Sequence, residues 1–172
     1  MIDIDSKEIR TISPSKEVVK SWNISEDDLF DLAFKNAERV LKPRFRSLAS
    51  VLTWALTSDS SDDAIFEDYY AESPFSYGPF VMFSKYSLNG ATFVFDKEIR
   101  RKIAEIFGED YYISFTSRHE AVITPVSAGV EKETLKEVLT DTIDCATDPK
   151  DFLSRSVYRY FSKYDVISAL VN

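Results

Sequence analysis

Apolar residues recur at helical spacing in a segment that begins near residue 26. They lie three or four positions apart, as one face of an α-helix requires, at Leu29, Ala33, Ala37, Val40 and Leu41, with Phe30 and Phe34 beside them. Ser25 stands where an N-cap hydroxyl accepts a backbone N–H, and three acids at 26–28 complement the positive end of the helix dipole. Pro43 marks the end of the segment. The pattern predicts an amphipathic helix whose apolar face is buried.

Further segments show the same period. Helices are expected over residues 14–22, 47–56, 96–108 and 131–143. Asp96 is the expected N-cap of the third of these helices, and Gly108 is expected to close it. Tyr164, Ile167 and Val171 also lie at helical spacing, so the pattern allows a final helix.

Short runs of apolar and aromatic residues predict strands. They cover residues 80–84, 111–115, 121–126 and 157–161, with a weaker strand signal at 7–12. Asn89-Gly90 is the pair that a tight turn with positive φ prefers. Residues 91–95 are therefore expected to return as the second strand of a hairpin with 80–84.

The order of these elements predicts an α+β domain. We expect a largely antiparallel four- to five-stranded sheet covered by helices on one face, with a helical N-terminal part. Residues 1–172 are expected to form a single domain. It consists of a mainly helical part (1–57), an acidic loop (58–78), a part with the sheet and further helices (79–161) and a tail (162–172).

Composition narrows the functional classes. The 172 residues include 24 aromatic side chains, 13 Phe, 9 Tyr and 2 Trp, which indicates a folded chain. The net charge of −8 disfavours direct nucleic-acid binding and docking on an anionic membrane, because both need basic patches. The first five residues lack the positive region and apolar run of a signal peptide, so we expect a cytoplasmic protein.

The sequence lacks the residues that several kinds of cofactor and metal site require. The four glycines are too far apart to form a phosphate-binding loop, so we expect no nucleotide cofactor. His119 and Cys145 are the only residues of their types, which excludes a Cys/His zinc site and an internal disulfide. A calcium loop starting at Asp59 would need Gly and Glu where Ala64 and Tyr70 stand. We therefore expect neither a metal nor a cofactor.

The best catalytic candidates lie between two predicted strands. His119 and Glu120 could act as a general base, with Ser117 as a nearby nucleophile. No sequence signal supplies an oxyanion donor or places a hydroxyl next to the imidazole. Polar residues in such a short connection more often bond to the backbone of the turn. We therefore predict no catalytic residues and keep a small hydrolase as the alternative.

One long segment is strongly acidic and rich in tyrosine. No basic residue occurs between Ser47 and Ser84, whereas six acids lie there and account for six of the eight net negative charges. Long loops in compact domains are often functional, and acids with tyrosines suit contact with a basic protein surface. The residues expected to bind a partner are Asp59, Asp62, Asp63, Glu67, Asp68, Tyr69, Tyr70, Glu72 and Tyr77. A loop that merely tucks its tyrosines onto the core remains the structural alternative.

Four stretches of the chain together resemble a known family. They are residues 22–29 (Trp-Asn-Ile-Ser-Glu-Asp-Asp-Leu), 88–91 (Leu-Asn-Gly-Ala), 112–120 (Tyr-Ile-Ser-Phe-Thr-Ser-Arg-His-Glu) and 154–160 (Ser-Arg-Ser-Val-Tyr-Arg-Tyr). In this order they are similar to stretches of an uncharacterised gut-bacterial family, domain of unknown function 5688. The resemblance implies that the chain corresponds to the C-terminal half of longer members, and it implies no known activity. The acidic stretch and the tail after Phe161 have no clear counterpart in it.

These observations favour a non-enzymatic acidic domain that binds a protein with a basic surface. A sharper form of this hypothesis is an inhibitor or modulator of a nucleic-acid-binding protein, of the type that phages and mobile elements encode. The first alternative is a hydrolase that uses His119. The second is a structural half of a larger protein, which an exposed apolar patch near residues 9–22 would favour. A homodimer is compatible with all of these.

Overall fold

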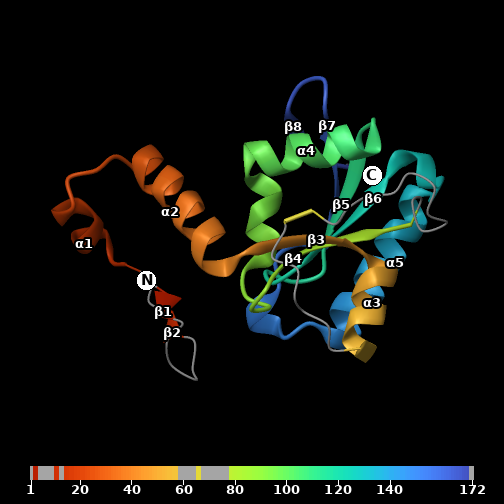
Figure 1. The fold of residues 1–172 in the computed structure, drawn as a ribbon, viewed down its shortest axis with the longest axis horizontal. Helices are drawn as coiled ribbons and strands as arrows, with labels where there is room; N and C mark the ends of the chain where they lie inside the picture. Colours follow the sequence, from red (N-terminus) through yellow and green to blue (C-terminus); the bar gives the residue numbers. More distant parts are fainter. Residues whose placement is uncertain (1, 4–9, 12–13, 58–64, 67–77, 171–172) are drawn as a thin grey trace. The chain divides into compact units, whose positions relative to one another are not determined.

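The chain forms two compact units, residues 1–40 and residues 41–172. The computed structural model describes residues 2–3, 10–11, 14–57, 65–66 and 78–170 (Figure 1).

The first unit contains one short strand pair and two helices. Strands β1 (Ile2–Asp3) and β2 (Arg10–Thr11) pair antiparallel. Helix α1 (Lys16–Ser21) is capped by the hydroxyl of Ser15, and helix α2 (Glu26–Leu41) runs to the first residue of the second unit.

The capping of α2 is confirmed, but its apolar face is buried only in part, with Leu29, Ala37 and Val40 half-buried. The hydroxyl of Ser25 accepts the N–H of Asp28 at 3.1 Å. Leu41 is the one fully buried residue of the helix, whereas Phe30 is 63% exposed and Ala33 is also exposed. The period of a sequence shows that a helix has an apolar face, but it cannot show whether the same chain supplies a second layer to cover that face.

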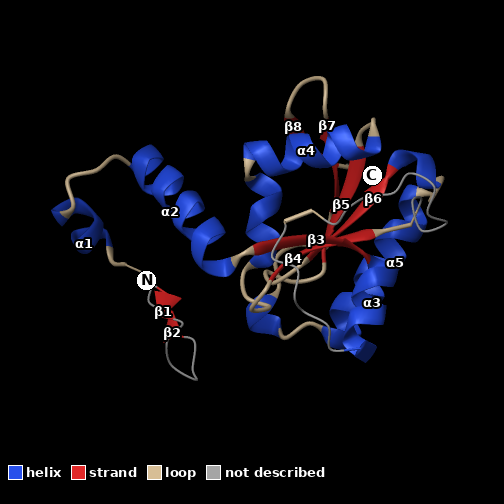
Figure 2. Cartoon of the chain, in the orientation of Figure 1, coloured by secondary structure: helices blue, strands red, loops and turns tan. Residues whose placement is uncertain are grey.

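The second unit is built on one antiparallel sheet of six strands (Figure 2). The spatial order is β3-β4-β6-β5-β7-β8. The strands are β3 (Pro43–Ser47), β4 (Phe80–Ser84), β5 (Tyr111–Phe115), β6 (Ala121–Pro125), β7 (Val157–Phe161) and β8 (Val166–Ala169). The predicted α+β class and antiparallel sheet are confirmed.

Helices and short 3₁₀ turns surround this sheet. The helices are α3 (Leu48–Thr57), α4 (Lys97–Phe107) and α5 (Lys132–Ala146), and the 3₁₀ turns are η1 (Gly90–Phe95), η2 (Val126–Ala128) and η3 (Pro149–Asp151). Asp96 caps α4 as predicted, because its carboxylate accepts the N–H groups of Glu98 and Ile99. Gly108 closes the helix with a φ of 70°, which favours glycine.

Neighbouring residues of β5 face opposite sides of the sheet and meet different helices. The hydroxyl of Tyr111 donates to the carbonyl of Arg100 on α4 at 3.1 Å. Tyr112, on the opposite face, packs beside Leu139 and Ile143 of α5. The two helices therefore cover opposite faces, whereas the sequence led us to expect helices on one face only.

Stacked aromatic side chains fill the face under α4. The ring of Phe45 on β3 stacks on that of Phe80 on β4, with centroids 5.1 Å apart, and Phe107 of α4 contacts both. Farther along the sheet, Tyr111 and Tyr160 are paired residues whose ring centroids lie 5.0 Å apart. This row of rings fixes α4 on the strands.

Residues 91–95 do not form the predicted return strand. They belong to η1, and β4 pairs with β3 and β6 instead. Asn89 does adopt the expected positive φ, at 51°. The apolar run is nevertheless buried as a 3₁₀ turn, in which Ala91 and Val94 lie three residues apart and are both buried.

The two edge strands were not predicted. Strand β3 begins at Pro43, and a proline is tolerated there because β3 is an edge strand. The strand was missed because its two arginines interrupt the apolar pattern by which strands were predicted. Strand β8 replaces the final helix that the spacing of Tyr164, Ile167 and Val171 allowed. The sheet of the second unit therefore has six strands in the described residues, where we expected four or five.

Candidate functional site

The predicted partner-binding residues belong to a segment whose middle alone is described. Asp59, Asp62, Asp63, Glu67, Asp68, Tyr69, Tyr70, Glu72 and Tyr77 all lie outside the described residues. Of the acidic segment, which we define as residues 58–78, the structure describes Ile65, Phe66 and Gly78.

Ile65 and Phe66 attach this segment to the sheet at edge strand β3. The carbonyl of Ile65 accepts the backbone N–H of Phe45 at 2.8 Å and a guanidinium N–H of Arg46 at 2.9 Å. The ring of Phe66 meets that of Phe45 edge to face, with centroids 5.8 Å apart. Asp63 lies two residues before this anchor along the chain, and Glu67 follows it directly. Sequence reasoning missed the anchor, although an apolar pair inside an acidic stretch was a usable signal.

The imidazole of His119 links three segments of the chain. Its Nδ1 accepts the backbone N–H of Asn89 at 3.1 Å, and its Nε2 lies 3.3 Å from a carboxylate oxygen of Asp151. Because Nδ1 accepts, a neutral imidazole carries its proton on Nε2, the nitrogen that lies beside the carboxylate of Asp151. Arg118 holds the other oxygen of Asp151 at 2.8 Å. Both ring nitrogens therefore serve contacts within the fold.

Ser117 and Glu120 are also engaged within their own turn. The hydroxyl of Ser117 accepts the backbone N–H of His119 at 3.0 Å. The carboxylate of Glu120 accepts the hydroxyl of Thr116 at 3.0 Å. The structure thus brings the three catalytic candidates into one turn, and its hydrogen bonds join them to the backbone or to Thr116 rather than to one another's reactive atoms.

Gly90 lets this turn approach the end of β4. A Cβ atom at residue 90 would lie 2.5 Å from the carbonyl oxygen of His119 and 2.5 Å from backbone atoms of Phe83. Real Cβ atoms do not approach backbone that closely, so glycine is required here for space. Asp151, the third partner, follows Pro149 in η3, and no feature of the sequence pointed to it.

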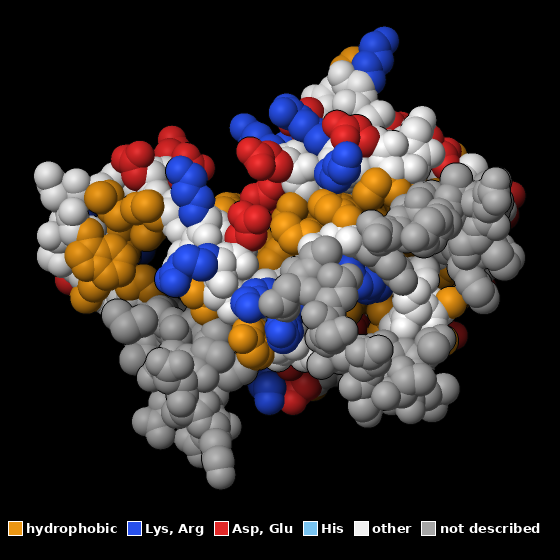
Figure 3. All heavy atoms as spheres, viewed as in Figure 1, with side chains coloured by type: hydrophobic (Ala, Val, Ile, Leu, Met, Phe, Trp, Pro, Cys, Tyr) orange, Lys and Arg blue, Asp and Glu red, His pale blue; other side chains and the backbone are white. Residues whose placement is uncertain are grey.

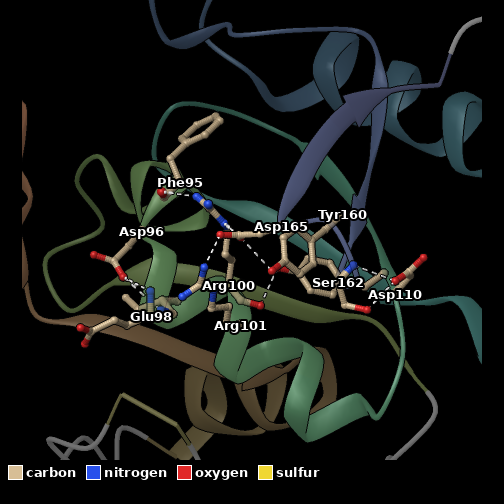
Figure 4. A network of polar contacts seen from close by, with 11 residues as sticks. Phe95, Asp96, Glu98, Arg100, Arg101, Asp110, Tyr160, Ser162 and Asp165 are labelled. Carbon is tan, nitrogen blue, oxygen red and sulfur yellow. Dashed lines mark hydrogen bonds and ion pairs between the residues drawn. The ribbon is translucent and has the colours of Figure 1, made fainter.

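A second polar cluster joins the β7–β8 turn to α4 (Figure 4). The carboxylate of Asp165 accepts Nε of Arg100 and a guanidinium N–H of Arg101, each at 2.6 Å, and the hydroxyl of Tyr160 at 3.0 Å. The hydrogen bond from Arg100 is the main reason that the pKa of Asp165 lies far below its usual value. Burial raises the pKa of Tyr160. The cluster places two of the four basic residues of α4 against one acid.

Asp110 closes the other side of this turn. Its carboxylate accepts the N–H and the hydroxyl of Ser162, at 2.9 and 2.8 Å, and pairs with Arg159 at 2.9 Å. Figure 4 shows Asp110 and Ser162 side by side beyond Tyr160. Both clusters have a structural role. Every charged group in them faces an opposite charge or a hydrogen-bond donor, and these contacts stabilise the sheet.

The described residues offer little for metal chemistry. Within them, no group of three or more His, Cys, Asp or Glu side chains is placed to hold a metal ion. Cys145 is exposed on α5. No helix in the described part has the length and apolar content needed to cross a bilayer.

Comparison with protein-family models matches residues 1–162 to a family of unknown function, DUF5688. The chain belongs to the DUF5688 family. Comparison with curated proteins gives no match, and comparison with solved structures gives none either. Strand β8 lies beyond the matched residues. That the chain corresponds to the C-terminal half of longer members stays a prediction.

Three of the four stretches that carried the DUF5688 resemblance lie together in the second unit. His119 of one stretch bonds to Asn89 of another, and β7, which overlaps the third at residues 157–160, pairs with β5. The fourth stretch, residues 22–29, belongs to the first unit. The His119 cluster is therefore where family motifs that are distant in sequence meet.

Proposed function

We propose that this DUF5688 domain is not an enzyme and acts by binding a protein with a basic surface through its acidic segment. The observation that carries the proposal is the attachment of that segment to β3 at Ile65 and Phe66. The anchor lies in the middle of the segment, and none of its six acids is more than six residues from the anchor along the chain. A local excess of negative charge speeds and selects association with a basic partner.

The distribution of the remaining charge supports the same surface. Outside residues 58–78 the net charge is −8 + 6 = −2. Several arginines of the second unit are already paired, as Arg159 is with Asp110 and Arg118 with Asp151. Most of the uncompensated charge of the chain therefore belongs to the acidic segment.

The hydrolase alternative receives less support. A general base needs a ring nitrogen that can reach the proton it removes. In this chain the Nδ1 of His119 already accepts the backbone N–H of Asn89, and its Nε2 lies beside the carboxylate of Asp151. The hydroxyl of Ser117, the candidate nucleophile, accepts a backbone N–H in the same turn.

The sharper form of the proposal is an inhibitor that occupies a nucleic-acid-binding groove. Carboxylates spaced along an extended segment can take the place of phosphates against lysines and arginines. Such a partner would release nucleic acid when this domain binds, and a competition assay with the partner's nucleic acid would detect that release.

The test compares capture of host proteins by three immobilised forms of the full chain. They are the wild type, the fourfold variant D62N/D63N/E67Q/D68Q, and a matched control, E98Q/E133Q/E137Q/D141N. The control loses the same four charges at exposed positions on α4 and α5. Proteins that bind through the acidic segment should be retained by the wild type and the control and lost with the fourfold variant. Equal capture by all three forms would overturn the proposal.

A further inference from the structure

The two edges of the six-stranded sheet differ in what the chain places beside them. At the β3 edge, Phe45 forms a parallel bridge with Phe66 of the acidic segment. At the other edge, β8 pairs with β7 on its inner side, and none of the described strands pairs with its outer side. A strand edge that is open in this way is a template for pairing with another chain.

Strand β8 lacks the features by which edge strands usually avoid such pairing. Residues 166–172 read Val-Ile-Ser-Ala-Leu-Val-Asn, with no charged side chain and no proline. The register with β7 runs through all four residues of β8 without a bulge. Charges, prolines and bulges are the usual protection of an edge, so this strand is able to accept a neighbour.

The phase of the β7–β8 hydrogen bonds shows which backbone groups of β8 point outward. The N–H of Leu170 donates to the carbonyl of Val157 at 2.9 Å, so these two residues are a hydrogen-bonded pair. Such pairs alternate with non-hydrogen-bonded pairs along an antiparallel ladder, so the backbone of Ser168 also points toward β7. The N–H and C=O groups of Ile167 and Ala169 therefore point toward the open edge.

Contacts at both ends hold β8 in place. Asp165, the residue before the strand, pairs with Arg100 and Arg101 of α4 (Figure 4). Leu170, the residue after it, packs against the apolar cluster that contains Leu139 of α5. A strand that its own fold already orders loses little conformational entropy when it pairs with another strand.

We propose that two copies of this chain associate through β8, with the two strands antiparallel about a two-fold axis at Ser168. Ile167 of each copy then exchanges backbone hydrogen bonds with Ala169 of the other. Val166 of each copy faces Leu170 of the other on the same side of the sheet. Val166 is 48% exposed in a single copy, so this cross-strand apolar pair removes it from water.

The conformation of Asp165 selects this register. An axis at Ile167 would fit the same hydrogen-bond phase, but it would place Ala169 of one copy opposite Asp165 of the other. Asp165 has a φ of 54° and lies before the strand, so it is not in the extended conformation that pairing requires. An axis at Ser168 instead pairs residues 166–170 along their whole length.

A second copy is the partner that this edge fits. The surface over α4 carries charges of both signs (Figure 3), whereas β8 carries none that could select a foreign peptide. Each copy has a net charge of −8, so two copies associate most readily where charge is absent. Strands β8 and β3 are opposite edges, five strand spacings or roughly 24 Å apart. The contact is therefore distant from the anchor of the acidic segment and independent of its proposed role.

The oligomeric state of the full chain tests the association. We expect sedimentation equilibrium to show a dimer whose population rises with protein concentration. S168K and S168E should each raise the dissociation constant severalfold, because two like charges face each other at the axis. Ser168 is exposed, so neither change should disturb the fold of the monomer. An equimolar mixture of the two variants should recover the dimer, since opposite charges then meet.

The matched controls are T134K and T134E, which introduce the same charges at an exposed residue of α5. They should leave the dissociation constant unchanged. A chain that remains monomeric up to millimolar concentration would overturn the proposal. A dimer that the variants of Ser168 and of Thr134 affect equally would overturn it as well.

Cysteine cross-linking tests the register. Cys145 is first replaced by Ser, because it is exposed. In that background Ser168→Cys faces its own copy in a non-hydrogen-bonded pair, with Cα atoms about 4.5 Å apart and within reach of a disulfide. The two copies of Val166→Cys are separated by roughly 14 Å. We expect a disulfide-linked dimer for Ser168→Cys only. Equal cross-linking of both variants, or none for Ser168→Cys, would contradict the proposal.

Discussion

At the scale of single residues, Gly90 is the position that depends most on its size. Its φ is not in the positive range that requires glycine, but backbone atoms of His119 and Phe83 leave no room for a Cβ. Gly108 shows the reverse situation, with a φ of 70° and open space around it. Glycine is therefore required at position 90 because there is no space for a Cβ, and it is favoured at position 108 because the backbone has a positive φ.

We expect Gly90→Ala to lower the free energy of unfolding by about 3 kcal/mol or more, because two segments of backbone must move apart. Gly108→Ala should cost only about 1 kcal/mol, the strain of a positive φ. Denaturant unfolding of both variants checks this. A Gly90→Ala variant as stable as Gly108→Ala would show that the contact between the His119 turn and β4 is loose.

Asp165 offers a prediction on pH. The carboxylate has a lowered pKa in the folded chain, so its contribution to stability is complete above its ordinary value near 3.8 and is lost as the pH falls through the folded value. Asp165→Asn keeps a side chain that tolerates the observed φ of 54° but removes the charge. We expect a loss of about 1–2 kcal/mol at neutral pH.

The difference between wild type and Asp165→Asn should shrink below pH 4, as the wild type loses this interaction. Thermal unfolding measured from pH 7 to pH 2 follows this change. Asp144→Asn is the control, because it breaks an exposed ion pair with Arg155 and should have little effect. A constant difference across the range would contradict the assignment.

Some residue roles were visible in the sequence, and others were not. The caps Ser25 and Asp96 are local features, so sequence alone identified them correctly. Asp151 and Asp165 act through partners that lie more than 30 residues away along the chain. A local sequence pattern cannot reveal contacts between residues that are so far apart along the chain. His119 was found because of its residue type, and its role emerged only from its contacts with Asn89 and Asp151.

At the scale of elements, the anchor of Ile65–Phe66 on β3 determines where the acidic segment attaches. Phe66→Ala removes the edge-to-face contact with Phe45 and should release the bridge. We expect a loss of about 1–2 kcal/mol of stability. The backbone N–H of Phe45, which the carbonyl of Ile65 accepts, should exchange with deuterium faster than in the wild type. Unchanged exchange at this amide would show that Phe66 is not what holds the bridge.

Some elements were predicted well, and residues 91–95 and the burial of α2 were not. Helix α4 and strands β4, β5 and β7 lie within a residue of the expected bounds. Residues 91–95 were misassigned because a five-residue apolar run fits a buried 3₁₀ turn as well as a strand. Burial of α2 was overestimated because amphipathicity says nothing about which surface covers the apolar face.

At the scale of the whole molecule, the division at residue 40 predicts that the larger unit folds alone. Leu41 is 1% exposed and belongs to the core of that unit, so a fragment of residues 41–172 keeps it. We expect this fragment to unfold in one cooperative transition, measured by circular dichroism. A fragment without a cooperative transition would show that residues 1–40 are needed for the sheet to form.

The central claim is that the acidic segment binds a basic protein. The most direct measurement is the dissociation constant of a protein captured by the wild type, determined over a range of salt concentrations for the wild type and for D62N/D63N/E67Q/D68Q. We expect the affinity of the wild type to fall steeply as salt rises, and the variant to bind weakly with little dependence on salt. Equal affinity and equal salt dependence for the two forms would contradict it.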